Sequence, residues 1–215
     1  MRGIVSIVRN GLTAVVGLIV VSLAVGSVAA EDDPYKAELD ALREALSKYQ
    51  DYQVAVRDLY LSTVACVYYS GQKMDGHMEY PEGAMGVHFV NLTFGGPTPD
   101  PMRPNVLLYE PVDGELRLVG AEWLVPLASG VTERPVLFGQ PFQGPMEGHE
   151  PLIPKEFVHY DLHIWLFKDN PLGMFSPTNP DVSCDGFDFA LLEHGTRLVD
   201  EPWAESALSQ QDEVD

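Results

Sequence analysis

The chain has 215 residues, of which 13 are Lys or Arg and 32 are Asp or Glu, so its formal net charge is −19. Nucleic acids and anionic lipid surfaces bind basic patches, and this acidic composition therefore argues against both kinds of partner. The length suits a single domain with one substantial hydrophobic core.

The first thirty residues have the pattern of a secretory signal peptide. Arg2 and Arg9 form a short positive region, residues 11–30 carry no charge, and Val28-Ala29-Ala30 places small residues before a cleavage point. We therefore expect residues 1–30 to be removed after Ala30 and the protein to be secreted or extracytoplasmic, in a periplasm or at the cell exterior. An uncleaved N-terminal anchor is the alternative, because a segment of about twenty uncharged residues can just span a bilayer.

Signal cleavage would leave residues 31–215, with 11 Lys and Arg against 32 Asp and Glu and a net charge of −21. We expect residues 31–200 to form one globular domain. Residues 201–215 are acidic and weakly patterned, which is typical of a disordered tail. The mature chain is not expected to bind a membrane.

An amphipathic helix is expected at the start of the domain. Asp33-Pro34 is typical of a helix start, with an acidic N-cap followed by proline at the first helical position. Apolar residues then recur every three or four positions, at Leu39, Leu42, Leu46, Tyr49, Tyr52 and Val56. The stripe predicts a helix of about twenty-five residues that packs on the rest of the domain, with room for a bend before Cys66.

Strand patterns follow after Gly71. The expected strands are rich in branched and aromatic residues and lie at 86–91, 105–110, 115–125 and 158–168, with a short edge segment at 135–138. Asp113-Gly114 is a dipeptide preferred in tight hairpins. We predict an α+β fold in which the long N-terminal helix packs on a curved, mainly antiparallel β-sheet or small barrel, because successive hairpins argue against βαβ units.

Two long loops rich in Gly and Pro separate these strands, at residues 95–104 and 139–154. Loops of such length within a compact domain are often functional rims or lids.

Cys66 and Cys184 are the two cysteines of the chain. In an oxidising compartment, an isolated pair far apart in sequence is typical of a structural disulfide. A pair of metal-binding or redox thiols is the alternative, but neither residue has basic neighbours in sequence that would stabilise a thiolate. We therefore predict a Cys66–Cys184 disulfide, which would tie the end of the helical region to the loop after the last strand.

An ordered series of short motifs resembles a family of exported prokaryotic proteins whose activity is not established. The motifs lie between Ser47 and Cys184 and are AMGVHFVN (84–91), LLYEP (107–111), LRLVGAEW (116–123), LFGQPF (137–142), HYDLHIW (159–165), NPLGMF (170–175) and NPDVSC (179–184). The resemblance implies export and assigns no catalytic residue. Residues from Asp185 onward lie outside it.

The segment 159–165 contains the most chemically suggestive pattern. In a β-strand, side chains at every second position share one face, so His159, Asp161 and His163 would line up. Such a row suits metal ligands or an acid–base cluster. A barrel strand whose polar side chains are satisfied by hydrogen bonds is an equally good interpretation.

Two further residues join this row if the strand faces converge. His88 and Glu122 lie on expected strands, and together with His163 they form a set of two histidines and one carboxylate. This donor set suits zinc, iron or manganese with open positions for water or substrate. We therefore predict that His88, Glu122 and His163 approach one another, with His159 and Asp161 as possible additional ligands. Alternatively, His88 and Glu122 form a buried hydrogen-bonded pair that braces the barrel.

Two hypotheses about function follow. The first is an exported protein that binds a divalent metal through His88, Glu122 and His163. The second is a non-catalytic module that holds a small apolar or amphipathic ligand in the mouth of the barrel. Trp165, Phe167, Met174 and Phe175 could line such a pocket, although aromatic residues at these positions are more often part of a core. The pattern does not decide whether the protein is an enzyme.

Overall fold

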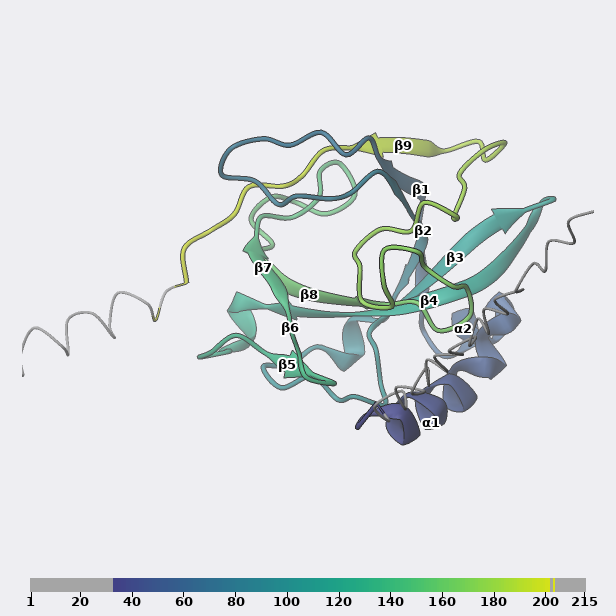
Figure 1. Cartoon of the computed structure of the whole chain (residues 1–215), viewed down its shortest axis with the longest axis horizontal. Coiled ribbons are helices and arrows are strands. Elements are labelled where there is room, and N and C mark those ends of the chain that lie inside the picture. The colour runs from purple at the N-terminus through teal and green to yellow at the C-terminus, as the bar shows by residue number, and fades with distance from the viewer. Residues whose placement is uncertain (1–32, 202, 204–215) are drawn as a thin grey trace, which may run out of the picture. The chain divides into compact units, whose positions relative to one another are not determined.

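A curved sheet of seven strands dominates the fold and forms a half-barrel (Figure 1). The computed structural model describes residues 33–201 and 203, and the described residues from Pro34 onward form one compact unit. The strands follow the order β7-β8-β4-β3-β2-β1-β9 across the sheet. They are β1 (Leu61–Tyr69), β2 (Gly83–Val90), β3 (Val106–Val112), β4 (Glu115–Pro126), β7 (Gln143–Met146), β8 (His159–Ile164) and β9 (Ala190–Glu193). The pairs are antiparallel except β1 with β9, which run parallel, so the sheet is mixed.

The helical part of the chain is shorter than the sequence pattern predicts. Helix α1 spans Lys36–Leu46, a 3-10 turn covers Ser47–Gln50, and a second short helix, α2, spans Tyr52–Arg57. The predicted helix of about twenty-five residues is therefore wrong, and so is the expected start at Pro34, because α1 begins at Lys36.

Asp51 explains why the helix is interrupted. Its backbone is extended, with φ −89° and ψ 102°, and its carboxylate accepts a hydrogen bond from the Gln53 N–H at 2.9 Å. An aspartate in this conformation is a good N-cap, so the chain stops one helix and starts another at the same residue. The apolar stripe continues across both helices, which is why the sequence pattern suggested one long helix.

The predicted strands at 86–91, 105–110 and 115–125 correspond to β2, β3 and β4. The last predicted strand, 158–168, is shorter in the structure and ends at Ile164. The expected edge segment at 135–138 becomes a small separate hairpin of β5 (Val136–Leu137) and β6 (Gln140–Pro141).

The turn between β3 and β4 is the hairpin that the Asp113-Gly114 dipeptide predicts. Val112 pairs with Glu115, and the two residues between them have φ values of 53° and 82°. Positive φ at both central positions is the requirement of a type I′ turn, which glycine satisfies without strain.

Alternation along the strands separates two apolar regions. On β8, Tyr160, Leu162 and Ile164 are buried in the large core, which also contains Leu39 and Leu42 of helix α1. A smaller cluster of Val67, Tyr69, Tyr80, Met85 and Met146 is separate from this core. The large core fixes the strands from the helical side, and the small cluster lies beside the cavity described below.

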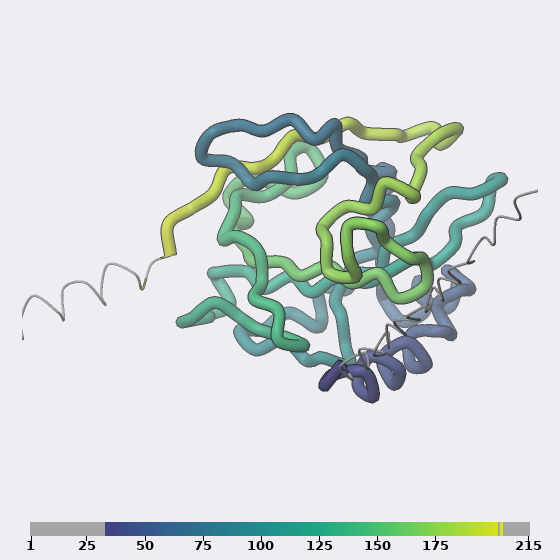
Figure 2. Tube along the Cα trace, in the orientation of Figure 1, coloured from purple at the N-terminus to yellow at the C-terminus, as the bar shows by residue number. Residues whose placement is uncertain are grey.

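The segment after β9 closes part of the gap between the two edges of the sheet. The Met78 N–H bonds to the Thr196 carbonyl and the Glu147 N–H bonds to the Arg197 carbonyl, at 2.8 and 2.9 Å. In Figure 2 the segment 71–82 and the end of the described chain accordingly run side by side. Edge strand β7 is thereby connected to the loop after β1.

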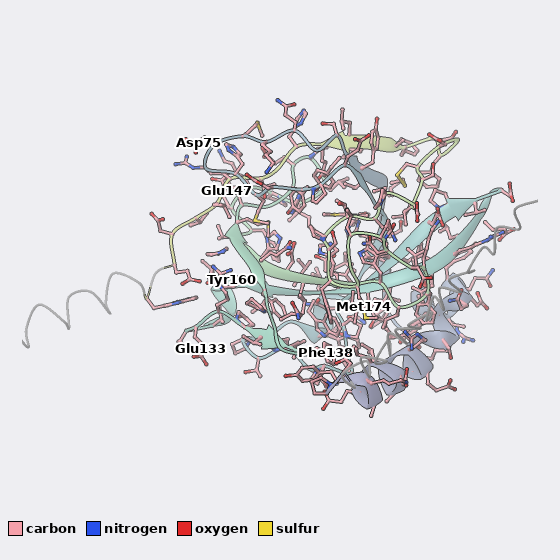
Figure 3. All side chains as sticks on the ribbon, viewed as in Figure 1. Asp75, Glu133, Phe138, Glu147, Tyr160 and Met174 are labelled. Carbon is pink, nitrogen blue, oxygen red and sulfur yellow. A yellow bond between two sulfur atoms is a disulfide. The ribbon has the colours of Figure 1, made fainter. Side chains whose placement is uncertain are left out.

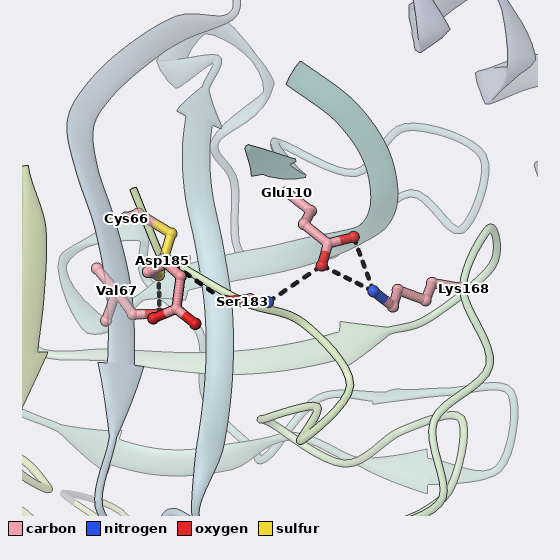
Figure 4. The surroundings of a disulfide bond; sticks show 7 residues. Cys66, Val67, Glu110, Lys168, Ser183 and Asp185 are labelled. Atoms are coloured by element: carbon pink, nitrogen blue, oxygen red, sulfur yellow. Dashed lines mark hydrogen bonds and ion pairs between the residues drawn. A yellow bond between two sulfur atoms is a disulfide. The ribbon is translucent and has the colours of Figure 1, made fainter. Parts of the chain in front are cut away.

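Cys66 and Cys184 form the predicted disulfide, with their Cα atoms 5.6 Å apart. Cys66 lies on β1 and not at the end of a helical region, because residues 61–69 are a strand. Next to the bond, Glu110 accepts hydrogen bonds from the Lys168 ammonium and from the Ser183 N–H (Figure 4). The disulfide and this carboxylate together fix the loop that leads into β9.

Several expectations concern residues outside the described part of the chain. The predicted signal peptide, residues 1–30, lies there, as do residue 202 and residues 204–215 of the predicted tail. Glu201 does contact the domain, since its Oε1 atom accepts a hydrogen bond from the hydroxyl of Tyr160, which is labelled in Figure 3, at 2.8 Å. Among residues 33–201 and 203, none of the helices is long and apolar enough to cross a membrane.

Candidate functional site

The site is built on strand β8. His159, Asp161 and His163 occupy alternate positions, are at most 2% exposed, and line the same cavity. The predicted row of polar side chains on one strand face is thus present. Strand β4 lies alongside, and the register places Glu122 directly opposite His163.

Glu122 lies between two histidines. Its Oε2 atom is 3.6 Å from Nε2 of His163 and 3.6 Å from Nε2 of His88, which lies on β2. Within this group, one ligand atom from each residue lies within 4.8 Å of the others. The structure therefore brings together the three residues that the sequence singled out.

These three side chains do not form a conventional hydrogen-bonded pair or triad. Glu122 Oε2 and both ring nitrogens of His163 are buried and have no hydrogen-bond partner among the described residues. A distance of 3.6 Å is too long for a good hydrogen bond between nitrogen and oxygen. The alternative of a His88–Glu122 pair that braces the barrel is therefore not what the structure contains.

His159 and Asp161 belong to a different group from the one the sequence suggested. They lie with His149, and the three offer ligand atoms that are within 4.8 Å of one another. His149 lies in the loop between β7 and β8, and sequence reasoning missed it. The only available signal was its place in the long loop 139–154, which was expected to be a rim or lid.

Glu193 on β9 is a second residue that the sequence did not reveal. Its Oε2 atom accepts a hydrogen bond from the Tyr69 hydroxyl at 2.6 Å and lies 3.1 Å from Nδ1 of His149. Glu193 is buried, and its other oxygen, Oε1, has no hydrogen-bond partner within the described chain. The contact between His149 and Glu193 joins the loop after one edge strand to the other edge strand.

One cavity unites both groups. Its volume is about 40 Å³. The residues that line it include all the histidines and carboxylates above, together with an apolar wall of Val67, Met85, Val90, Leu124, Leu152 and Ile153. A space of this size holds ions or a few water molecules, whereas pockets for organic ligands are typically about 300–1,000 Å³.

The aromatic residues considered for an organic-ligand pocket do not line this cavity. Trp165 belongs to the large core, where its indole N–H donates to the Ser176 carbonyl at 2.7 Å. Phe167 and Phe175 pack against the same core.

Burial controls the electrostatics of the carboxyl groups. Desolvation raises the pKa of Glu122 well above its ordinary value, and the neighbouring Asp161 raises it further. Burial also raises the pKa of Asp161 to about 7, although His149 opposes this change. Glu193 differs, because the contacts from His149 and Tyr69 outweigh burial and leave its pKa lowered.

Burial acts in the opposite direction on the histidines. It lowers the pKa of His88 and of His159 to about 4, and it lowers that of His163 well below the ordinary value, with repulsion from His88, His149 and His159 as further causes. These imidazoles are therefore neutral at physiological pH. The neutral imidazole is the form that coordinates a metal ion.

The spacing of the first group fits metal coordination. Two ligand atoms that each lie about 2.1 Å from a tetrahedral ion are roughly 3.4 Å apart, close to the separations around Glu122. Three protein ligands would leave at least one coordination position for water or another molecule. An ion at this point would also stabilise the ionised form of the Glu122 carboxyl group, which burial otherwise disfavours.

Comparison with known proteins adds no assignment. The chain matches no protein-family model, no curated protein and no solved structure.

Proposed function

We propose that this is an exported metal-binding protein in which His88, Glu122 and His163 hold a divalent ion such as zinc, iron or manganese. The observation that carries the proposal is that two of these ligand atoms are buried without a hydrogen-bond partner. Glu122 Oε2 and His163 Nε2 are buried, face each other across 3.6 Å, and have no hydrogen-bond partner among the described residues. Buried polar groups are normally satisfied, so these atoms call for a bound cation or an equivalent polar ligand.

Two further observations support a metal ion, and a third supports export. The neutral histidines and the carboxylate supply the nitrogen and oxygen donors that zinc, iron and manganese accept. The cavity, at about 40 Å³, suits an ion with one or two waters better than an apolar or amphipathic organic ligand. The Cys66–Cys184 disulfide fits an oxidising, extracytoplasmic compartment.

Metal analysis and titration test the proposal directly. The protein, purified from its native compartment without chelators, should contain stoichiometric metal. After a chelator has removed this metal, isothermal titration calorimetry should show that the protein binds added Zn²⁺. His163→Ala should lose the ion, because it removes a ligand at the centre of the site. His194→Ala is the matched control, since His194 is exposed and lies next to Glu193 outside the cavity.

Two results would overturn the proposal. One is a metal-free wild-type protein that also fails to bind added Zn²⁺, Fe²⁺ or Mn²⁺. The other is His163→Ala protein that folds normally and binds as many metal ions, and as tightly, as the wild type. Co-purification of an organic ligand with metal-free protein would instead favour the ligand-binding hypothesis.

A further inference from the structure

The cavity contains a second, separate set of metal-ligating groups. His149, His159 and Asp161 repeat the donor chemistry of the first site, with two imidazoles and one carboxylate, and share none of its residues. Both sets line the same cavity. The sequence predicts His159 and Asp161 as extra ligands of the first ion, but in the structure they group with His149.

The two histidines of this second set are oriented as metal ligands usually are. Nδ1 of His149 contacts the Glu193 carboxylate at 3.1 Å, and Nδ1 of His159 contacts the Phe157 carbonyl at 3.0 Å. Metal-binding histidines typically donate one ring N–H to a carboxylate or a backbone carbonyl, which fixes the ring and leaves the other nitrogen for the ion. In both residues that other nitrogen is Nε2.

The atoms available for coordination are buried and unsatisfied. Nε2 of His159 and Oδ1 of Asp161 have no hydrogen-bond partner within the described chain, and the two residues are 0% and 1% exposed. Both atoms belong to side chains that line the cavity. Leaving such buried groups unpaired is unfavourable.

The position of His149 depends on a tightly folded loop. The His149 carbonyl accepts a hydrogen bond from the Ile153 N–H at 2.8 Å, and the Gly148 N–H bonds to the Lys155 carbonyl at 3.2 Å. A Cβ atom at Gly148 would lie 2.0 Å from the Pro154 carbonyl oxygen, so only glycine allows this close approach. The loop thereby places His149 against the strand that carries its two partners.

The charge of the cavity is compatible with two divalent ions. Three carboxyl groups, Glu122, Asp161 and Glu193, line the cavity, and the nearby histidines bind metal in their neutral form. A single divalent ion would leave a buried negative charge if all three carboxyl groups were ionised. Two divalent ions would give a net charge of about +1 with the same groups, so two ions balance the three carboxylates as closely as one ion does.

We propose that Nε2 of His149, Nε2 of His159 and the Asp161 carboxylate bind a second divalent metal ion, so that the cavity holds two ions side by side. Glu193 positions His149 and does not need to touch the ion itself. This inference goes beyond the proposed function, because the second site has ligands of its own and does not require the first.

Metal stoichiometry of the full exported chain tests the inference. Chelator-treated protein is titrated with Zn²⁺, and bound metal is counted by mass spectrometry of the native protein. Co²⁺ provides an independent probe, because each ion with this donor set gives its own visible absorption. Wild-type protein should bind two ions, and His194→Ala protein, the exposed control, should also bind two. Asp161→Asn and His149→Ala should each bind one.

The variants separate failure of the second site from failure of the first. His88→Ala should lose the first ion and keep the second. If His88→Ala retains both ions while Asp161→Asn loses one, the proposed function fails and the second site stands. A wild-type stoichiometry of one ion that Asp161→Asn and His149→Ala both retain, or two ions retained in both variants, would overturn the second site.

Glu193→Gln provides a test that does not remove a ligand. It retains the shape of the side chain but weakens the acceptor that fixes His149, so affinity at the second site should fall about 10–100-fold while the stoichiometry stays at two. Unchanged affinity would contradict the positioning role. Circular dichroism identifies any variant that fails to fold, and the nearly isosteric Asp161→Asn and Glu193→Gln are expected to fold.

Discussion

Burial and a bound metal ion should have opposite effects on the protonation of the Glu122 carboxyl group. Burial and the neighbouring Asp161 both raise the pKa of its carboxyl group, which favours the neutral, protonated form in the metal-free protein. A bound divalent ion reverses this preference, because an adjacent positive charge favours the carboxylate. Glu122 is therefore suited to metal binding.

The Glu122→Gln variant separates the effect of this residue on metal binding from its effect on the stability of the metal-free fold. Glutamine imitates the protonated acid, so the free energy of unfolding of the metal-free protein should change by less than about 1 kcal/mol. Zn²⁺ affinity at the first site should fall by more than about 100-fold, since the change removes a charged ligand and not merely an outer partner. Denaturation in the presence of a chelator and titration calorimetry measure the two quantities.

Glu115→Gln is the matched control, because Glu115 lies on the same strand and is exposed. It should leave both quantities unchanged. A Glu122→Gln variant that binds Zn²⁺ normally would contradict the assignment of Glu122 as a ligand.

The sequence contains enough information to predict part of the site. His88, Glu122 and His163 lie on strands whose period-two alternation defines a face, so the prediction needed only that the faces converge. His149 and Glu193 could not be predicted in this way. One lies in an irregular loop and the other on a short strand after Cys184, and neither position has a periodic pattern that gives the direction of a side chain.

At the scale of elements, the backbone path of the loop between β7 and β8 determines the position of His149 in the second site. Its path requires glycine at 148, where the added Cβ would collide with the Pro154 carbonyl. The loop must shift to accept any side chain at this position, and His149 would shift with it.

Gly148→Ala should therefore weaken the second site selectively. We expect the affinity for the second Zn²⁺ ion to fall at least about tenfold, because displacing a ligand or its support typically costs 10–100-fold. The first ion should bind as in the wild type. Two-site titration calorimetry measures both affinities.

Gly96→Ala is the control for a glycine substitution in a loop. A Cβ atom at Gly96 would meet nothing within 4 Å, so both affinities should be retained. Equal weakening of the two sites by Gly148→Ala would indicate general loosening of the fold and would contradict a local role for the loop.

The elements themselves were partly predictable. The hairpin of β3 and β4 follows from Asp113-Gly114 and from the branched residues on either side. The length of the helix was overestimated because the apolar stripe continues on both sides of Asp51. An N-cap residue such as Asp51 interrupts a helix without changing the spacing of the apolar residues around it. Strand β1 was missed although Val64, Val67 and Tyr68-Tyr69 favour a strand, since the helical pattern before it was taken as dominant.

At the scale of the whole molecule, the disulfide holds together parts of the sheet that are far apart in sequence. The two cysteines are 118 positions apart, and Cys66 pairs in register with Ala190 at the start of β9. Strand β9 has four residues and lies at an edge of the sheet, where it pairs with β1.

Replacing both cysteines by alanine should lower the free energy of unfolding by roughly 2–5 kcal/mol, because a long loop is no longer constrained in the unfolded chain. Urea denaturation of the oxidised wild type and of the double variant measures this difference. Adding a reductant should destabilise the wild type and leave the double variant unchanged. Equal stability of the two proteins would show that the disulfide contributes nothing to the fold.

Metal binding should stabilise the whole domain, because the ligands come from elements across the sheet. Strands β2, β4 and β8 and the loop before β8 converge on the cavity only in the folded chain. An ion that binds the folded state alone at a free concentration of 100 times its dissociation constant stabilises that state by about 2.7 kcal/mol. For a domain of this size, each kcal/mol raises the midpoint of thermal unfolding by about 2–4 °C. One saturated site should thus raise the midpoint by roughly 5–11 °C, two sites by more, and a chelator should reverse the change.

The His88→Ala/His149→Ala double variant is the decisive comparison, because it removes one ligand from each site. Its unfolding temperature should not respond to Zn²⁺, and a response equal to that of the wild type would place the stabilising ion outside this cavity.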